Sequence, residues 1–275
     1  MLPNPLLPVT KYGRVHTVVH QCYSTAKTVS GNPPPTRFIR KAKSGTSWTQ
    51  KDLVAYNISL VSRSAAAFFG QDPQALSVPN NHPLLRDTTS GITDKDVIRV
   101  LRTMKTATMT PGPNGDSSAV VSFTMDLLYA LGYAETNSGR IVQSHRKIPL
   151  YICGKWRHAK TDLNVFDMDQ DSIILVVQNV EHYTSNLKSD KSIPWLVAEA
   201  IAAFQRNNRV RKESGLSPLD SKVMPGITMT GTFPTFFKVC VSTELVLAIE
   251  SGQYPATPTI VEMHVPVIPR PQPFQ

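Results

Sequence analysis

The chain of 275 residues, 41% of them hydrophobic and 18% charged, is long enough to bury a hydrophobic core without disulfide or metal staples. Its three cysteines, Cys22, Cys153 and Cys240, are widely spaced and odd in number, so we expect neither a disulfide framework nor a zinc site of closely spaced ligands. No stretch has the apolar length needed to cross a bilayer and the first residues do not form a secretion signal, so we expect an intracellular protein, in the cytoplasm or nucleus, without a membrane partner.

The formal net charge of +9 is unevenly distributed along the chain. Up to Trp48 there are seven Lys or Arg residues and no Asp or Glu. A second stretch without acidic residues runs from 140 to 160, and its candidate nucleic-acid-binding residues are Arg146, Lys147, Lys155 and Arg157. Such runs favour DNA or RNA as a partner, and the alternative is a solvated basic surface that keeps the protein soluble.

The first part of the chain is predicted to be irregular and then helical. Residues 1–48 combine basic residues with a run of three prolines that forbids a helix, so we expect a basic N-terminal extension. Residues 49–116 are predicted to be a helical accessory region, because Thr49 and Thr93 each begin a capping signature and Gly70 can end a helix.

Residues 117–265 are predicted to form an α/β core, followed by a proline-rich tail over 266–275. The hydrophobic period changes from helical to alternating after Gly132. The predicted core elements are a helix over 120–131, strands over 141–144, 148–153, 163–166 and 173–177, a helix over 194–210, strands over 227–230 and 235–241, and a helix over 243–249.

The order of a helix, a group of short strands, a helix and two strands resembles the core of the restriction-endonuclease-like nucleases, the PD-(D/E)XK superfamily, in which the first group has three strands. In that superfamily an Asp on the second strand is followed by Glu-x-Lys or Asp-x-Lys on the third. Residues 159–167 resemble the second strand and 172–178 resemble the third, and Asp162 matches the first acidic position. The resemblance implies an α/β fold with a central mixed sheet flanked by helices, preceded by a helical and irregular N-terminal region. Strands 159–167 and 172–179 are then neighbours, with the helix over 194–210 on their face.

The stretch 148–178, together with 196–208 and 224–228, also resembles an uncharacterised family of fungal proteins with this core. In that family the third strand usually ends Gln-Glu-Asp-Lys, whereas this chain reads Gln178-Asn179-Val180-Glu181. Asn179 therefore stands at the position of the acid, and Glu181 stands at the position of the lysine.

The altered motif bears on the metal chemistry that the resemblance implies. Two acidic side chains of such a nuclease hold Mg²⁺ against the scissile phosphate while the lysine orients water. An amide is a weak Mg²⁺ ligand, and a carboxylate cannot supply the positive charge of a lysine. The candidate catalytic residues are Asp162, Glu181 and Lys160, of which Asp162 and Glu181 are the candidate metal ligands. Because residues two apart on a strand share a face, Asn179 and Glu181 are expected to point towards Asp162.

Three interpretations remain open. The first is a nuclease-like protein that is catalytically impaired and binds nucleic acid. The second is an active Mg²⁺-dependent nuclease with a migrated acidic site, which uses Asp162 and Glu181, with Glu199 as a further acid and Lys160 or His158 as the positive group. The third is a non-catalytic protein-interaction module on the same fold, since a fold does not by itself establish a function.

Overall fold

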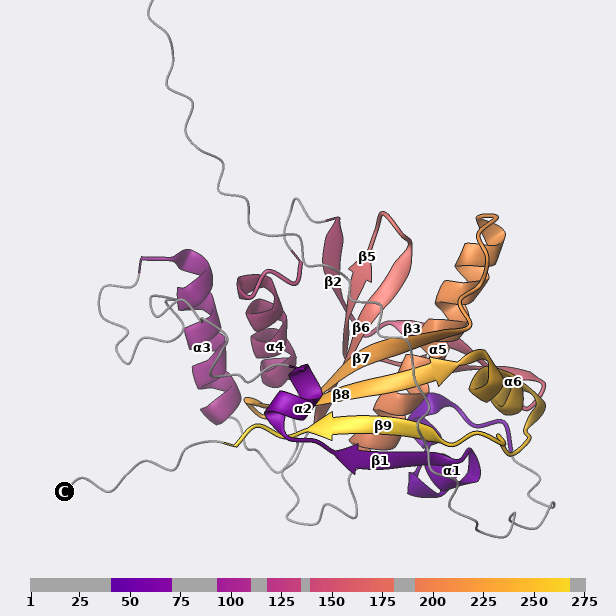
Figure 1. Ribbon diagram of the computed structural model, residues 1–275. Helices are drawn as coiled ribbons and strands as arrows, with labels where there is room; N and C mark the ends of the chain where they lie inside the picture. Colours follow the sequence, from indigo (N-terminus) through magenta and orange to yellow (C-terminus); the bar gives the residue numbers. More distant parts are fainter. Residues whose placement is uncertain (1–40, 71–92, 110–117, 135–138, 181–190, 268–275) are drawn as a thin grey trace, which may run out of the picture.

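A seven-stranded mixed sheet forms the centre of the molecule in the computed structural model, which describes residues 41–70, 93–109, 118–134, 139–180 and 191–267 (Figure 1). The expected N-terminal extension up to residue 40 and the tail from residue 268 lie outside the described residues. The elements, in chain order, are η1 (Gly45–Ser47), α1 (Gln50–Ala55), β1 (Ile58–Ser62), α2 (Ala65–Phe69), α3 (Lys95–Met109), α4 (Ser118–Ala130), β2 (Arg140–Ser144), β3 (Lys147–Ile152), β4 (Lys155–Lys160), β5 (Leu163–Asp167), β6 (Ser172–Val180), α5 (Ser192–Glu213), β7 (Ser221–Thr230), β8 (Phe233–Ser242), α6 (Thr243–Ser251) and β9 (Thr259–His264).

The strands of the main sheet lie in the order β1-β9-β8-β7-β6-β5-β2, and β3 and β4 form a separate two-stranded hairpin. Strands β2, β5 and β6 are antiparallel neighbours, as are β7, β8 and β9. Strand β6 is parallel to β7, so the chain has to cross over between them, and α5 makes this crossover. None of the described helices has the length and apolar character needed to cross a membrane.

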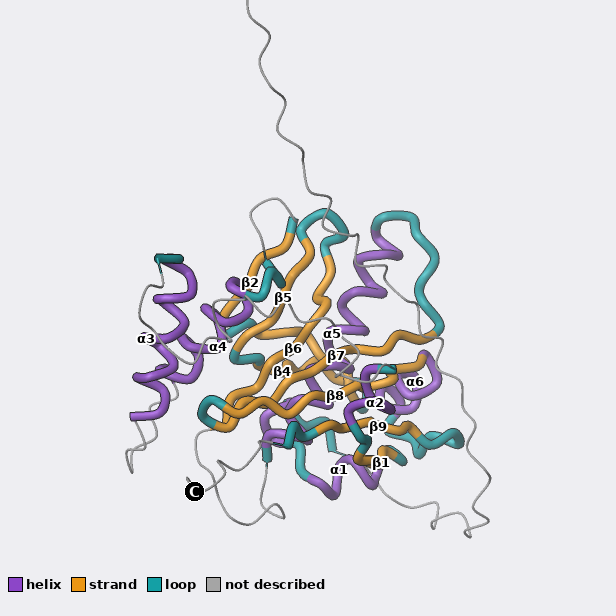
Figure 2. Tube along the Cα trace, turned by 60° about the vertical axis from the view of Figure 1, so that its left-hand side comes forward, coloured by secondary structure: helices purple, strands orange, loops and turns teal. Residues whose placement is uncertain are grey.

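Helices cover both faces of the sheet, because alternate residues of each strand are apolar towards opposite sides. Val176 and Met224 belong to the core that includes α5, whereas Leu175 and Val177 belong to a second core with α4 and α3. Figures 1 and 2 show α3 and α4 side by side, apart from α5 and α6. The approach of α5 to the sheet is close, since a Cβ atom added at Gly226 of β7 would lie 2.8 Å from a Leu196 methyl group.

The local signals for helix ends are confirmed, except that the residue that caps α3 is Asp94 rather than Thr93. The Asp94 carboxylate accepts from the backbone N–H groups of Asp96 and Val97 at the start of α3. Gly70 and Gly252 end α2 and α6 in the left-handed conformation that a residue without Cβ adopts readily. The helix predicted over 194–210 is present as α5, longer by a few residues at each end.

The pairing of the two motif strands is confirmed in part. Strands β5 and β6 are antiparallel neighbours and α5 packs on β6. The strand predicted over 159–167 is divided, however, because Ala159 and Lys160 belong to β4 of the hairpin and β5 begins only at Leu163. Thr161 and Asp162 form the corner between the two sheets.

Strands β1 and β9 were not predicted, although they occupy one end of the main sheet. They pair in parallel from Ile58 with Thr259 to Ser62 with Met263. Segment 49–116 therefore contributes a strand as well as helices. Neither short run has a distinctive hydrophobic alternation, and the partner that makes each a strand lies about two hundred residues away in the chain.

The spacing of the cysteines does not predict which of them form a disulfide. Cys153 has a free thiol, whereas Cys240 in β8 is disulfide-bonded. Distance along the chain does not determine which thiols a fold brings together. The disulfide of Cys240 therefore departs from what the cysteine spacing led us to expect.

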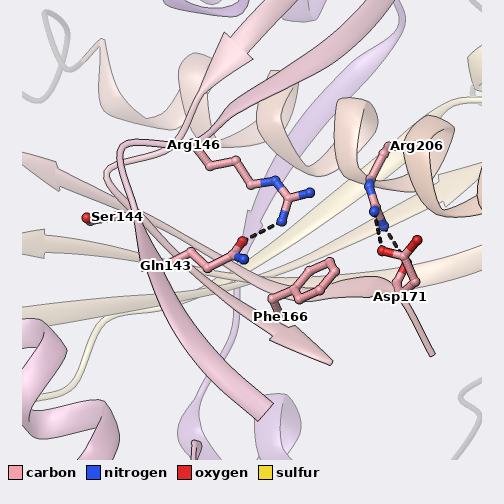
Figure 3. A pocket seen from close by; sticks show the side chains of 6 residues that line it. All are labelled: Gln143, Ser144, Arg146, Phe166, Asp171 and Arg206. Carbon is pink, nitrogen blue, oxygen red and sulfur yellow. Dashed lines mark hydrogen bonds and ion pairs between the residues drawn. The ribbon is translucent and has the colours of Figure 1, made fainter. Parts of the chain in front are cut away.

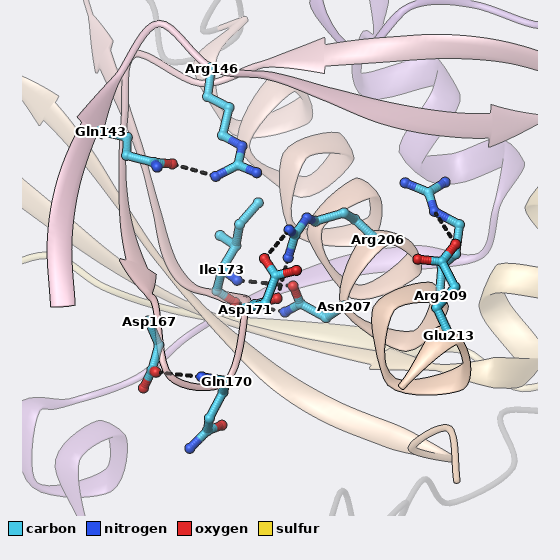
Figure 4. Close-up of polar contacts among 10 residues, drawn as sticks. All are labelled: Gln143, Arg146, Asp167, Gln170, Asp171, Ile173, Arg206, Asn207, Arg209 and Glu213. Carbon is cyan, nitrogen blue, oxygen red and sulfur yellow. Dashed lines mark hydrogen bonds and ion pairs between the residues drawn. The ribbon is translucent and has the colours of Figure 1, made fainter. Parts of the chain in front are cut away.

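Two side chains of α5 fasten the helix to the turn between β5 and β6. Arg206 donates to the backbone oxygen and the carboxylate of Asp171 (Figure 3). The side chain of Asn207 accepts from the backbone N–H of Ile173 at 2.9 Å and donates to the Ile173 oxygen at 2.8 Å (Figure 4). Ile173 lies next to a register shift between β5 and β6, and Asn207 satisfies backbone groups at this irregularity.

We expect Asn207→Ala to lower the free energy of unfolding by about 2 to 4 kcal/mol, because both backbone groups of buried Ile173 lose their partner. Urea unfolding of the full chain measures this change. Glu213→Ala, at an exposed position on the same helix, serves as the control and should change stability by less than about 0.5 kcal/mol. Equal stability of the two variants would show that Asn207 does not hold α5 on the sheet.

Candidate functional site

Asp162 lies at the corner between the hairpin and the main sheet, beside the end of β6. Its Oδ2 atom accepts from the Gln178 side-chain amide at 2.9 Å and from the backbone N–H of Asn179 at 2.8 Å. Its backbone oxygen accepts from the N–H of His145, which joins the corner to the loop after β2. The structure therefore brings Asp162 to the end of the third motif strand, where its Oδ2 atom accepts from two neutral amides.

Asn179 is oriented differently from the prediction. Successive strand residues face opposite sides, and the side chain of the preceding residue, Gln178, contacts Asp162. The side-chain oxygen of Asn179 instead accepts from the Thr124 hydroxyl of α4 at 3.5 Å. Asn179 contacts Asp162 through its backbone N–H, and Glu181, the predicted second acid, lies outside the described residues.

Lys160 does not share a strand with Asp162 as expected. It is the last residue of β4, and its register partner across the hairpin is Lys147. Both lysines are exposed, as is His158 two residues earlier. The backbones of Thr161 and Asp162 continue this pairing with Arg146 and His145, and Lys160 itself lies on the exposed surface of β3 and β4.

Glu199 of α5 is the second acid that the structure places near Asp162. Its side chain is 1% exposed, and neither carboxylate oxygen has a hydrogen-bond partner among the described residues. Burial raises the pKa of Glu199 well above its ordinary value, and the negative charge of Asp162 raises it further. Both effects favour the protonated carboxylic acid.

This cluster does not fit Mg²⁺ in the way the resemblance implies. Mg²⁺ requires several oxygen ligands in near-octahedral geometry, whereas Asp162 Oδ2 receives two N–H donors and Glu199 favours its neutral form. Within the part of the chain that the structure describes, no group of three or more His, Cys, Asp or Glu residues is arranged to hold a metal ion.

The hairpin β3-β4 presents a basic and aromatic face. Paired residues of an antiparallel hairpin share a face, so the Lys147–Lys160 pair and the Tyr151–Trp156 pair lie on the same side. Trp156 is 57% exposed, and its ring lies 4.9 Å from the Tyr151 ring and 5.4 Å from the Arg209 guanidinium. Two lysines directly opposite each other repel, and an anion would relieve that repulsion.

The other two predicted binding residues of the hairpin lie on its opposite face. Lys155 pairs with Ile152 and Arg157 pairs with Leu150, both of which are core residues. Arg157 donates to the backbone oxygens of Ala42 and Trp156. The structure therefore separates Lys155 and Arg157 from Lys147, and gives Arg157 a role in holding the segment before η1.

Arg146 lies in an open pocket beside this hairpin (Figure 3). The Arg146 and Arg206 guanidinium groups lie 4.7 and 5.2 Å from the centre of the Phe166 ring. Burial lowers the pKa of Arg146, and the neighbouring positive charge of Arg206 lowers it further, while Asp171 opposes both effects. The residues that line the pocket are Gln143, Ser144, Arg146, Phe166, Asp171 and Arg206.

Sequence reasoning missed Gln178, Phe166 and Arg206. The signal for Gln178 was its position directly before Asn179. Because strand residues alternate, the Gln178 side chain points to the face opposite to that of Asn179. Arg206 lies seven residues after Glu199, which puts both on one side of α5. No pattern in the sequence indicates that Phe166 lies between two arginines, because that contact joins three separate elements.

Comparison with models of known protein families gives no match, and comparison with curated proteins gives no significant match.

We expect Glu199→Gln to stabilise the protein relative to the parent as pH rises. The protonated Glu199 contributes its full stability below the ordinary Glu pKa of 4.5, and this contribution is lost as pH rises through the raised pKa of the folded state. Glutamine stays neutral, so the stability difference between variant and parent should grow with pH by at most about 1.4 kcal/mol per pH unit. Urea unfolding across a pH series measures it.

The matched control is Glu213→Gln, which neutralises an exposed carboxylate at the end of the same helix. This control should retain the pH dependence of the parent. A Glu199→Gln variant whose stability runs parallel to that of the parent at every pH would contradict the expected titration of Glu199.

Proposed function

We propose that this chain is a nuclease-like protein of the restriction-endonuclease-like, PD-(D/E)XK type that is catalytically impaired and binds DNA or RNA. The observation that carries the proposal is the environment of Asp162. An acid stands beside the end of the third motif strand, where such nucleases hold their metal, but neutral amides from Gln178 and Asn179 satisfy it. Asn179 and Glu181 stand where the motif has its second acid and its lysine, so the chain keeps the first acid of the motif without the other two groups.

The order of elements supports the choice of fold. With the hairpin β3-β4 set aside, the chain runs through α4, the antiparallel strands β2, β5 and β6, helix α5, and then β7 and β8. Strand β7 is parallel to β6, and β8 is antiparallel to β7. This is the sequence of one helix, three strands, one helix and two strands expected for the family, with the hairpin inserted before the second strand.

The basic face of the hairpin supports nucleic acid as the partner. Lys147 and Lys160 provide two adjacent positive charges for phosphates, and exposed Trp156 provides a ring on which a base can stack. Both lysines and Trp156 lie on the hairpin β3-β4, and its second strand ends just before Asp162 in the chain. A bound strand would therefore pass close to the altered site.

A cleaving nuclease with a migrated acidic site is the second candidate. One observation favours it, which is the position of Glu199 close enough to Asp162 for each charge to affect the other. That candidate requires both acids to be ionised at once, so a bound divalent cation would have to compensate their burial and mutual repulsion.

We expect the purified full chain to show no Mg²⁺- or Mn²⁺-dependent cleavage of single- or double-stranded DNA or RNA above the level of Asp162→Ala. The physical reason is that Asp162 is held by amides and Glu199 favours its neutral form. Gel analysis of labelled substrates provides the measurement. Strong cleavage by the parent that Asp162→Ala abolishes would establish the second candidate instead.

We also expect nucleic-acid binding that weakens steeply between about 50 and 200 mM salt, because phosphate neutralisation releases counterions. The double variant Lys147→Gln/Lys160→Gln should bind more weakly and reduce the slope of log affinity against log salt by roughly two. Filter binding or fluorescence anisotropy measures both quantities.

The charge-matched control is Lys95→Gln/Lys105→Gln, which removes two exposed lysines from α3 on the other side of the sheet. This variant should bind like the parent. Equal losses from both double variants would show that net charge, rather than the hairpin face, governs binding.

A further inference from the structure

The pocket around Phe166 is built by three separate parts of the fold. Gln143 and Ser144 end β2, Arg146 follows them in the loop to β3, and Phe166 lies on β5. Arg206 enters from α5 (Figure 3). The pocket is open to solvent and lies next to the corner that carries Asp162, since the N–H of Thr161 donates to the backbone oxygen of Arg146.

The two arginines of the pocket differ in how their charges are compensated. Arg206 is bound to the backbone oxygen and carboxylate of Asp171. Arg146 donates to the neutral side-chain oxygen of Gln143, and among the described residues no carboxylate lies within ion-pair distance of it. One carboxylate therefore faces two guanidinium groups, and the pocket retains an excess positive charge (Figure 4).

Phe166 fixes the position of this uncompensated charge. Both guanidinium groups lie near its ring, and the face of an aromatic ring attracts cations. The bond from Arg146 to Gln143 orients the guanidinium further, and it leaves the Gln143 amide nitrogen available as a donor. The exposed hydroxyl of Ser144 lies on the rim. The pocket thus presents an oriented arginine fork with neighbouring donors, which suits a tetrahedral oxyanion.

We propose that this pocket binds a phosphate group of the nucleic-acid backbone, with Arg146 as its principal ligand. The inference rests on the proposed function and adds to it the place where one phosphate is held. Arg146 directly precedes Lys147, so a backbone bound in the pocket continues onto the Lys147–Lys160 pair of the hairpin. A bound phosphate offsets the cost of burying Arg146 and its repulsion by Arg206.

The test measures binding of short labelled single strands of DNA and RNA to the full chain by fluorescence anisotropy over a range of salt concentrations. Arg146→Gln should raise Kd about tenfold and reduce the salt slope by about one, as expected for the loss of one phosphate contact. Arg146→Lys keeps the charge but loses the fork, so its Kd should lie between those of Arg146→Gln and the parent. Arg102→Gln, an exposed arginine on α3, is the matched control and should bind like the parent.

A second measurement uses inorganic pyrophosphate as the probe. It should raise the thermal unfolding temperature of the parent and of Arg102→Gln, and it should compete with the labelled strands, but it should not stabilise Arg146→Gln. Because this readout needs no nucleic acid, it tests the pocket separately from the proposed function. Circular dichroism of each variant verifies that it is folded, and Arg146→Lys replaces Arg146→Gln in both measurements if the latter does not fold.

The outcomes distinguish the two proposals. Nucleic-acid binding by Arg146→Gln with the affinity and salt slope of Arg102→Gln would overturn the pocket as a backbone-phosphate site and leave the proposed function intact. No nucleic-acid binding by the parent at low salt would overturn the proposed function. In that case, stabilisation by pyrophosphate that requires Arg146 would show that the occupant is a free phosphate compound, and no stabilisation would overturn the pocket as a phosphate site of either kind.

Discussion

Helix α5 packs against β6, β7 and the hairpin strand β3 at once, and its burial positions the side chains at both sites. Thirteen of its 22 residues are buried, and its Leu196 side chain lies against Gly226, where a Cβ atom would not fit. Such a helix is stable in place only when apolar surface covers most of its sides. The contacts of Arg206 and Asn207 with the β5–β6 turn then fix how far along the sheet the helix lies. Without that docking, Glu199 would not lie near Asp162, and Arg206 would not lie near Arg146.

The two charged positions of α5 experience opposite environments, although they lie only two turns apart. Glu199 is enclosed, so burial and the nearby Asp162 disfavour its ionisation. Arg206 reaches the edge of the sheet, where Asp171 and the Phe166 ring surround it. A buried acid that favours neutrality and a basic group that remains charged leave a positive potential along this side of the molecule.

The environment of Asp162 shows how an altered motif can remain compatible with a stable fold. A carboxylate beside a strand end needs either a cation or hydrogen-bond donors to compensate its desolvation. Here Gln178 and the Asn179 backbone provide the donors, while the Asn179 side chain is directed to Thr124. The Asp162 carboxylate is therefore compensated by donors from the strand that follows it in the chain.

The sequence alone determined the features that depend on neighbours within a few residues. Glycines at helix ends, the Asp94 cap, the apolar period of α5 and the change in the motif at Asn179 are all local, and the first three are present in the structure. Tertiary structure decided what depends on contacts between distant segments. It paired β1 with β9, divided the motif strand at Thr161, turned the Asn179 side chain towards α4 and placed Arg146 and Arg206 near Phe166. The physical reason is that backbone propensity and periodicity act over one or two turns, whereas register, strand pairing and burial arise only when the whole sheet and α5 pack together.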